Sequence, residues 1–240
     1  MTKAGNETDL LRQSGWLSKA PVGFQDTVLA RGHRSTFAAG KILYDIDDPP
    51  GGMFGVASGT ASVTTISPGG VSKLSHILRP GEWFGVASIL VREPRRVRIE
   101  AQVPLKTFVL PVREIDAILG DAAGGHVAWQ QFARLMIANS DLAVGVARDL
   151  MIRDSTMRCF AVILRLSGYR HSLAVREEHP ELEMAQEDLA FLSNLSRNAV
   201  GSILRQLEQE KVIEIAYRRI RLLKPSALVG RLSSYEADNP

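Results

Sequence analysis

The spacing of apolar residues changes along the chain and predicts different elements in different stretches. Between about residues 34 and 111 the apolar residues form short runs separated by glycine and proline, which is typical of strands joined by turns. Strands at this regular spacing predict a compact antiparallel β-roll or barrel. Residues 1–20 are expected to form a short helix against it. The expected strands lie around 37, 42–44, 53–56, 61–66, 71–78, 97–103 and 107–110.

After the β-rich stretch, the apolar residues follow helical spacing. Residues 112–119 predict a short helix and residues 126–151 a long one. Along the long helix they recur three or four positions apart, as in the seam of a two-stranded coiled coil whose register Asn139 would fix. The start of this face could instead pack on the β-roll. The expected seam consists of Phe132, Leu135, Asn139, Leu142, Val146 and Leu150.

The clearest helical pattern lies near the C-terminus, over about residues 197–208. Ser196 stands where an N-cap belongs, since its hydroxyl can accept a hydrogen bond from an unpaired amide of the first turn. Four apolar residues at helical spacing predict the buried face, namely Val200, Ile203, Leu204 and Leu207. The opposite face is expected to expose Arg197, Asn198, Ser202 and Arg205.

The segments around this helix predict a winged helix-turn-helix. A shorter apolar helix around Leu189 precedes it, and Asn194 between the two tolerates the left-handed backbone of a tight turn. Two short strands follow, around residues 212–215 and 220–222. The alternative is an ordinary small helical domain, because two amphipathic helices and a turn are common. The turn between the two strands is expected to contain Tyr217, Arg218 and Arg219.

Charge is concentrated in this C-terminal stretch. The whole chain carries a formal charge of only +3, but residues 196–224 contain seven Lys or Arg against three Glu. Such an excess supplies the sequence-independent attraction to phosphate that a DNA-binding protein needs. Arg205, Arg218 and Arg219 are expected to hold phosphate. No glycine-rich loop with a following lysine, no metal-ligand spacing and no nucleophile with a nearby base is recognisable, so an enzyme is not expected.

Length and composition bound the remaining possibilities. The 240 residues, 45% of them hydrophobic and 23% charged, suffice for two globular domains. The single cysteine, Cys159, excludes an internal disulfide and a four-cysteine iron–sulfur cluster, and its apolar neighbours favour packing over sensing. A polar start and the lack of a long apolar run predict a cytoplasmic protein without a membrane partner. Residues past 231 are expected to be disordered, and the polar insertion at 168–183 has no evident role.

Residues 79–101 are distinctive within the β-rich stretch. They combine a glycine bend, a short apolar turn and a strand that opens with arginines. Strand alternation places Arg95 on the inner face, aimed at the bend after Gly85, where successive backbone amides could bind an anion. The alternative is that Arg95 pairs with a nearby carboxylate, Glu93 or Glu82, and binds no ligand.

The run QEDLAFLSNLSRNAVGSILRQLEQEKVI, residues 186–213, resembles the recognition unit of the CRP/FNR family of bacterial transcription regulators, down to its core S-R-x-x-V-x-x-x-L-x-x-L. By this resemblance Arg197 matches the arginine that reads a guanine, since a guanidinium can donate two hydrogen bonds to O6 and N7 in the major groove. Asn198 stands where the family commonly has glutamate, and Ser202 where it often has a second arginine. Both departures imply a different preferred operator. Ala185 replaces the usual threonine before the first helix.

The segment 79–101 is similar to the phosphate-binding cassette of the cyclic-nucleotide-binding fold. The family has a glutamate for the ribose hydroxyl where this chain has Val86, and a serine or threonine for the phosphate where it has Arg96. A buried hydroxyl left without a partner costs about 1–3 kcal/mol, so cyclic AMP is not expected to be the natural ligand. The positions that match are Phe84, Gly85, Pro94, Arg95 and Ala101. The residues expected to hold a small effector of open identity are Gly85, Val86, Ala87, Arg95 and Arg96.

Other features of the chain give no support for cyclic AMP or haem, and no cofactor is assigned. Ala143 and Val144 of the long helix lie roughly where relatives that bind cyclic AMP place hydroxyl side chains, and they offer none. Haem bound through a histidine is not expected, because His33, His76 and His126 have no ligand spacing.

These patterns together predict an α+β protein in three parts. Residues 1–125 are expected to form an effector-sensing β-roll, 126–153 a dimerisation helix and hinge, and 154–240 a winged helix-turn-helix. The resemblance implies a homodimer that binds a pseudo-palindromic operator in double-stranded DNA, with RNA polymerase as a further partner. Effector binding would shift the long helix and move the hinge near Asp154. The alternative function is a sensor module whose C-terminal domain contacts proteins instead of DNA.

Overall fold

The chain forms two compact units, and their boundary falls inside one long helix, between Ser140 and Asp141. The structure, a computed structural model, describes residues 7–66, 70–170 and 175–239. The first unit consists of residues 1–140 and 173–175, and the second of residues 141–172 and 176–240. The expected three-part division at residues 125 and 153 stays a prediction.

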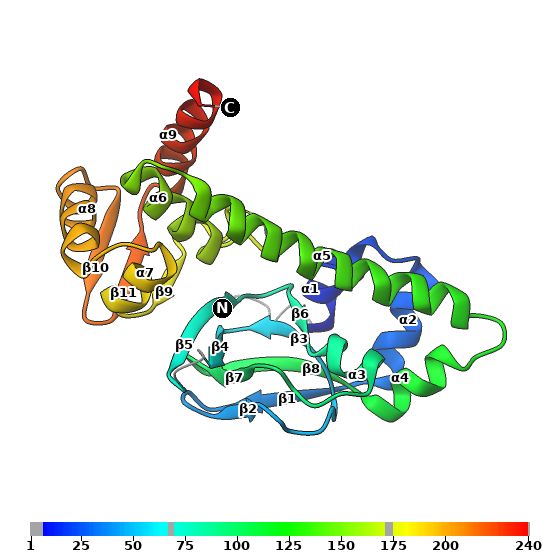
Figure 1. The fold of residues 1–240 in the computed structure, drawn as a ribbon. Coiled ribbons are helices and arrows are strands. Elements are labelled where there is room, and N and C mark those ends of the chain that lie inside the picture. Colours follow the sequence, from blue (N-terminus) through cyan, green and yellow to red (C-terminus); the bar gives the residue numbers. More distant parts are fainter. Residues whose placement is uncertain (1–6, 67–69, 171–174, 240) are drawn as a thin grey trace, which may run out of the picture. The chain divides into compact units, whose positions relative to one another are not determined.

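The described part of the first unit contains the expected β-roll (Figure 1). Its strands are β1 (His33–Phe37), β2 (Ile42–Tyr44), β3 (Gly52–Ser58), β4 (Ala61–Ile66), β5 (Ser72–Leu78), β6 (Trp83–Phe84), β7 (Arg98–Ala101) and β8 (Leu105–Pro111). They form two antiparallel sheets, with the orders β1-β8-β3-β6 and β2-β7-β4-β5. The prediction missed only β6, whose two residues are too few to show a period.

Side chains from both sheets share one apolar core, which holds the roll together. In β7 the alternation is regular, because Ile99 and Ala101 are buried whereas Arg98 and Glu100 are only half-buried. Ile99 lies opposite Val63 of β4 on one side and Tyr44 of β2 on the other. The buried core residues are Tyr44, Val56, Ala61, Leu78, Phe84, Ile99, Ala101 and Leu105.

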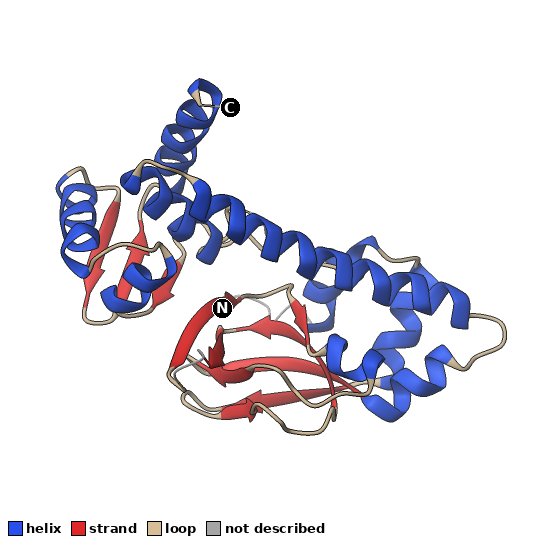
Figure 2. Cartoon of the chain, in the orientation of Figure 1, coloured by secondary structure: helices blue, strands red, loops and turns tan. Residues whose placement is uncertain are grey.

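Helical segments cover a second apolar core of the first unit, and Figure 2 shows them gathered beside the strands. They are α1 (Glu7–Gln13), the 3-10 turn η1 (Leu17–Lys19), α2 (Val22–Arg31), α3 (Val86–Val91) and α4 (Val112–Leu119). Trp16 lies in this core, and its Nε1 donates a hydrogen bond to the carbonyl of Gln131 at 2.7 Å. Helix α2 was not predicted from the sequence, since it buries only Phe24, Gln25 and Val28 and has no clear apolar face.

The long helix α5 (Gly125–Met151) confirms the expected element but not the expected seam. Phe132 and Leu135 are buried in the core of the first unit, whereas Asn139 and Leu150 are exposed. Phe132 and Leu135 therefore cannot belong to an intermolecular seam, because packing within the first unit already occupies them. This is the outcome that the alternative, packing on the β-roll, predicts for the start of the helix.

A different face of α5 is apolar and exposed. Ile137, Val144 and Met151 recur every seven residues, and these residues are 59%, 57% and 79% exposed. Exposed small residues lie between them at the positions that complete a three-and-four spacing. We call this face the α5 stripe, and it consists of Ala133, Ile137, Ser140, Val144, Ala147 and Met151.

The second unit contains the expected helices and the wing. Its elements after α5 are α6 (Ser155–Leu166), β9 (Glu181–Glu183), α7 (Gln186–Leu192), α8 (Arg197–Gln209), β10 (Ile213–Ala216), β11 (Arg219–Leu222) and α9 (Pro225–Asp238). The three strands form one antiparallel sheet with the order β10-β11-β9. Asp154 caps α6, because its carboxylate accepts a hydrogen bond from the amide of Met157 at 2.8 Å.

The structure corrects one expectation about the C-terminal part of the chain and explains part of another. The tail past Arg231 is not disordered, since α9 continues to Asp238 and buries Leu228 and Leu232. The insertion at 168–183 ends in β9, which adds a third strand to the wing; its residues 171–174 lie outside the described residues.

Cys159 is fully buried in α6, and burial raises the pKa of its thiol to about 12, so packing is its role. Within the described ranges, no helix has both the length and the apolar character required to span a bilayer.

Candidate nucleic-acid interface

The two helices α7 and α8 meet at a corner whose geometry follows from local sequence. Asn194 adopts the left-handed conformation, with a φ of 51°, as expected. The hydroxyl of Ser196 accepts a hydrogen bond from the amide of Ala199 at 3.2 Å, which confirms it as the N-cap of α8. At the start of α7, the Asp188 carboxylate accepts from the amide of Ala185 at 3.1 Å. This bond stabilises the start of α7, where the side chain of Ala185 has no polar group that could cap the helix.

Helix α8 turns an apolar face inward and a polar face outward. The predicted inner residues Val200, Ile203, Leu204 and Leu207 are all buried. The polar residues Arg197, Asn198, Ser202 and Arg205 are exposed, as expected. Arg205 donates from Nη2 to the hydroxyl of Ser202 at 3.2 Å, so these two neighbours on the exposed face are linked. The face therefore presents hydrogen-bonding groups without an apolar patch.

The hairpin of β10 and β11 carries the other basic residues. Tyr217 is 92% exposed in the turn, and Arg218 beside it has a left-handed φ of 53°. Within the part of the chain that the structure describes, the Arg218 side chain has no hydrogen bond or ion pair. Its cation is therefore available to a partner.

Arg219, the next residue, has a different environment. Its Nη2 lies 2.9 Å from Oε1 of Glu183, and its Nε lies 3.4 Å from Oε2 of Glu181. Both carboxylates belong to β9, which the sequence analysis did not identify as a strand. Two acids thus already balance the charge of Arg219, so a phosphate would have to compete with them for this arginine.

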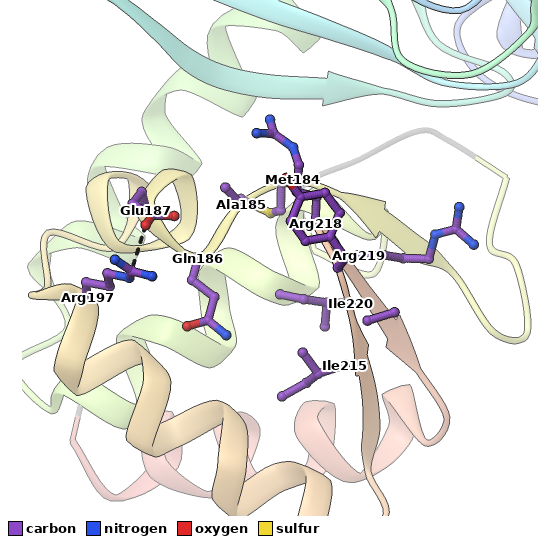
Figure 3. A pocket seen from close by; sticks show the side chains of 11 residues that line it. Met184, Ala185, Gln186, Glu187, Arg197, Ile215, Arg218, Arg219 and Ile220 are labelled. Atoms are coloured by element: carbon purple, nitrogen blue, oxygen red, sulfur yellow. Dashed lines mark ion pairs between the residues drawn. The ribbon is translucent and has the colours of Figure 1, made fainter.

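A cavity of about 240 Å³ lies between the starts of α7 and α8 and the wing, and Figure 3 shows its lining. Arg197 and Arg218 are among the residues that line it. Nε of Arg197 lies 3.0 Å from Oε1 of Glu187, the second residue of α7, and the two side chains are 70% and 57% exposed. The sequence contained no signal for this pair, because the pair depends on how α7 and α8 meet.

In the β-roll, Arg95 is buried and points inward as expected, and it pairs with neither Glu93 nor Glu82. Its Nη1 donates to the carbonyl of Gly85 at 2.6 Å, and its Nη2 to the carbonyl of Gly52 at 2.5 Å. Neither acceptor was anticipated from the sequence.

The surroundings of Arg95 are aromatic and tightly packed. Its guanidinium lies 4.3 Å from the ring centroid of Tyr44, and burial raises the pKa of that phenol to about 12. Phe54 stacks on Phe84 with a centroid distance of 5.2 Å. Gly85 has a φ of 87°, and a Cβ there would approach Arg95 Nη1 to 3.0 Å. Arg95 therefore donates its hydrogen bonds to backbone carbonyl groups of the β-roll itself, in a tightly packed site.

The residues around Arg95 do not fit a cyclic nucleotide. Val86 is fully buried and offers no acceptor for a ribose hydroxyl. Arg96 is exposed and forms an ion pair with Glu93, so it does not face the same site as Arg95. Ala87, half-buried, contributes no polar side-chain group. Of the expected ligand residues, Gly85 and Arg95 are joined directly by a hydrogen bond.

The described residues contain no cluster of histidine, cysteine, aspartate or glutamate suited to a metal ion. Of the histidines considered, His33 and His126 are exposed and His76 is buried 3.6 Å from the carboxylate of Glu82.

A β-roll, a long helix and a winged helix-turn-helix with an exposed polar recognition face are together typical of a DNA-binding transcription regulator. The comparison with known families agrees in both units. Residues 34–121 match the family model of the cyclic nucleotide-binding domain, and residues 157–231 match that of the Crp-like helix-turn-helix domain. The two models together cover more than half of the chain. The chain belongs to the CRP/FNR family of transcription regulators.

Individual relatives are distant in sequence. The chain is 24% identical over 187 residues to the transcriptional regulatory protein btr of Bordetella pertussis. The aligned region covers 77% of this chain and 74% of that protein. The structure is similar to FixK2 from Bradyrhizobium japonicum, with a TM-score of 0.61 and 19% identity, covering 83% of this chain and 96% of that one. It is also similar to TTHB099, a regulator of the CRP family from Thermus thermophilus, with a TM-score of 0.59, 22% identity and the same two coverages. These likenesses show a shared fold.

Proposed function

We propose that the protein is a sequence-specific DNA-binding regulator that acts as a homodimer on a pseudo-palindromic operator. The observation that carries this proposal is the position of Arg197 at the exposed start of α8, across one cavity from the wing cation Arg218. The major groove admits an α-helix, and residues near the start of a recognition helix contact base edges.

The exposed side chains divide into two roles. Arg197 reads a guanine, and Asn198 and Ser202 face the neighbouring bases. Ser196, Arg205 and Arg218 hold backbone phosphates, because they flank this reading face with a hydroxyl and two cations. Arg219 contributes less to phosphate binding, since Glu181 and Glu183 already pair with it.

A second copy of the chain is the proposed partner of the α5 stripe. The apolar members of the stripe recur every seven residues and are exposed in the single chain, and the small residues between them allow two helices to approach closely. A twofold axis along this face would pair two recognition helices, which suits half-sites one DNA turn apart. RNA polymerase is a further proposed partner, as the resemblance implies.

Modulation by a small anion in the β-roll belongs to the same proposal. An anion would have to draw Arg95 away from two carbonyl oxygens, so it must offer at least two acceptors of its own. Cyclic AMP is not the proposed effector, because Val86 and Arg96 supply none of the contacts expected from the residues they replace.

Selection from a random duplex library tests the proposal. The wild-type protein should enrich a sequence with two half-sites related by twofold symmetry. Its affinity for that sequence should fall steeply with salt, because phosphate contacts release counterions. A protein that is monomeric in solution and enriches no sequence would overturn the proposal and favour a sensor module that contacts proteins.

A further inference from the structure

We propose that Glu187 is a positioning residue that sets the specificity of Arg197, and this inference rests on the proposed function above. The two residues come from different helices of the motif, and Nε of Arg197 lies 3.0 Å from Oε1 of Glu187 (Figure 3). In the part of the chain that the structure describes, Arg197 has no partner other than Glu187.

The ion pair acts on the orientation of the guanidinium. An arginine side chain is long and loses much rotamer freedom when it is fixed in a planar contact. Glu187 approaches the guanidinium from the Nε side, so the two terminal nitrogens are left to donate in parallel to O6 and N7 of one guanine. Orientation before binding reduces the entropy lost in the specific complex.

The same carboxylate acts against unspecific contacts. With no carboxylate beside it, Arg197 could turn to a phosphate at any DNA sequence, since phosphate accepts the same bonds from a guanidinium. Glu187 competes with phosphate for Arg197 and adds a negative charge to a face that DNA approaches. It therefore weakens binding to all duplexes but weakens it least where a guanine holds Arg197.

The neighbouring acid of α7, Asp188, has a different structural role. The carboxylate of Asp188 accepts from the amide of Ala185 and supports the start of the helix. Glu187 has no hydrogen bond or ion pair other than that with Arg197 among the described residues, and its side chain is 57% exposed. Exchange of Glu187 should therefore leave the fold intact, which circular dichroism checks.

The experiment compares wild type with Glu187→Gln, which removes the charge, and Glu187→Asp, which keeps the charge but shortens the side chain. Dissociation constants are measured for the selected operator and for random duplex. In Glu187→Gln the ratio, defined as the dissociation constant for random duplex divided by that for the operator, should fall roughly threefold to tenfold. This fall is part of the discrimination that one arginine–guanine contact supplies. Most of this fall should come from tighter binding to random duplex. In Glu187→Asp the ratio should fall while the affinity for random duplex stays near wild type.

Two controls separate positioning from charge alone. Glu214→Gln removes one charge from an exposed acid of β10, whose closest arginine is Arg221 at 3.9 Å, and should change both affinities by the same factor. In the Arg197→Ala background, Glu187→Gln should not lower the ratio further, because Glu187 acts through Arg197.

The outcomes are distinct. A wild-type protein without any sequence preference overturns the proposed function and this inference with it. A wild-type protein with a clear preference, together with a Glu187→Gln variant that keeps the ratio within roughly twofold or behaves as Glu214→Gln does, overturns this inference alone.

Discussion

Asp149 at the end of α5 and Arg165 of α6 form a fully buried ion pair, with Arg165 Nε 3.3 Å from Asp149 Oδ2. Arg170 shares the carboxylate through its own Nε at 2.7 Å and reaches Glu236 of α9 through Nη2 at 2.6 Å. These contacts join segments on both sides of Asp154 into one body. A swing at the expected hinge near Asp154 would separate the buried pair.

Exchange of Asp149 for alanine should therefore strongly destabilise the second unit. The change leaves the Arg165 guanidinium buried without its acid, which costs about 3–5 kcal/mol in the free energy of unfolding. Burial already lowers the pKa of Arg165, and Asp149 opposes this shift. Urea unfolding followed by far-UV circular dichroism measures the loss.

The matched control is Asp141→Ala, an exposed acid on the same helix, which should change the free energy of unfolding by less than about 0.5 kcal/mol. Adding Arg165→Met to Asp149→Ala should restore part of the stability, because the uncompensated charge is then gone. A double variant no more stable than Asp149→Ala would contradict this explanation.

Charge introduced into the α5 stripe should abolish the dimer without unfolding the chain. Val144→Glu places a carboxylate at a residue that is 57% exposed in the single chain but buried against a second copy in the proposed dimer. Sedimentation equilibrium should give the mass of one chain, with an unchanged circular dichroism spectrum. Operator affinity should fall because one chain engages only one half-site.

Asn139→Glu separates the two candidate faces of α5. Asn139 belongs to the seam expected from the sequence but lies outside the α5 stripe. This variant should remain a dimer if the stripe is the interface. A dimer that survives Val144→Glu but not Asn139→Glu would show instead that the interface is the seam expected from the sequence.

Arg95 should matter more for the stability of the β-roll than for binding a nucleotide. Arg95→Ala removes two charged hydrogen bonds and leaves two carbonyl oxygens without these donors, for an expected loss of about 2–4 kcal/mol in the free energy of unfolding. The exposed Arg96→Ala should lose less than about 0.5 kcal/mol.

Calorimetry with cyclic AMP completes this test of the roll. No saturable heat is expected at micromolar concentrations of nucleotide, because Val86 and Arg96 offer neither the ribose nor the phosphate contact. Low-micromolar binding that Arg95→Ala abolishes would show instead that Arg95 is a phosphate ligand.

The two wing arginines should differ in their effect on DNA affinity. Arg218→Ala removes a cation that has no partner among the described residues. Affinity should therefore fall alike for every duplex, and the slope of log affinity against log salt should lose about one unit. Arg219→Ala should change the slope less, since Glu181 and Glu183 already balance its charge. Equal loss of slope in both variants would mean that DNA displaces those acids.

The features predicted correctly from the sequence depend on neighbours within a few residues. Ser196 caps α8 because the amide that it satisfies lies three residues ahead. The buried face of α8 repeats with the helical period, and Asn194 supplies the turn through its own backbone. Arg95 was placed inward correctly, although β7 begins only at Arg98 and the chain bends at residues 96 and 97.

The features that the sequence did not predict depend on contacts between distant segments. The Gly52 carbonyl that receives Arg95 lies 43 residues away in the chain. The α5 stripe and the expected seam have similar spacing, and only the packing of Phe132 and Leu135 in the first unit shows which face is occupied.

The sequence alone thus determined the β-roll, the long helix, the winged helix-turn-helix and the exposed position of Arg197. Periodicity and capping decide these features, and both act over a turn of helix or a pair of strand residues. Only the tertiary structure decided the partners of each charge, Glu187 for Arg197 and Glu183 for Arg219, because ion pairs form between whichever segments the fold brings within a few ångströms.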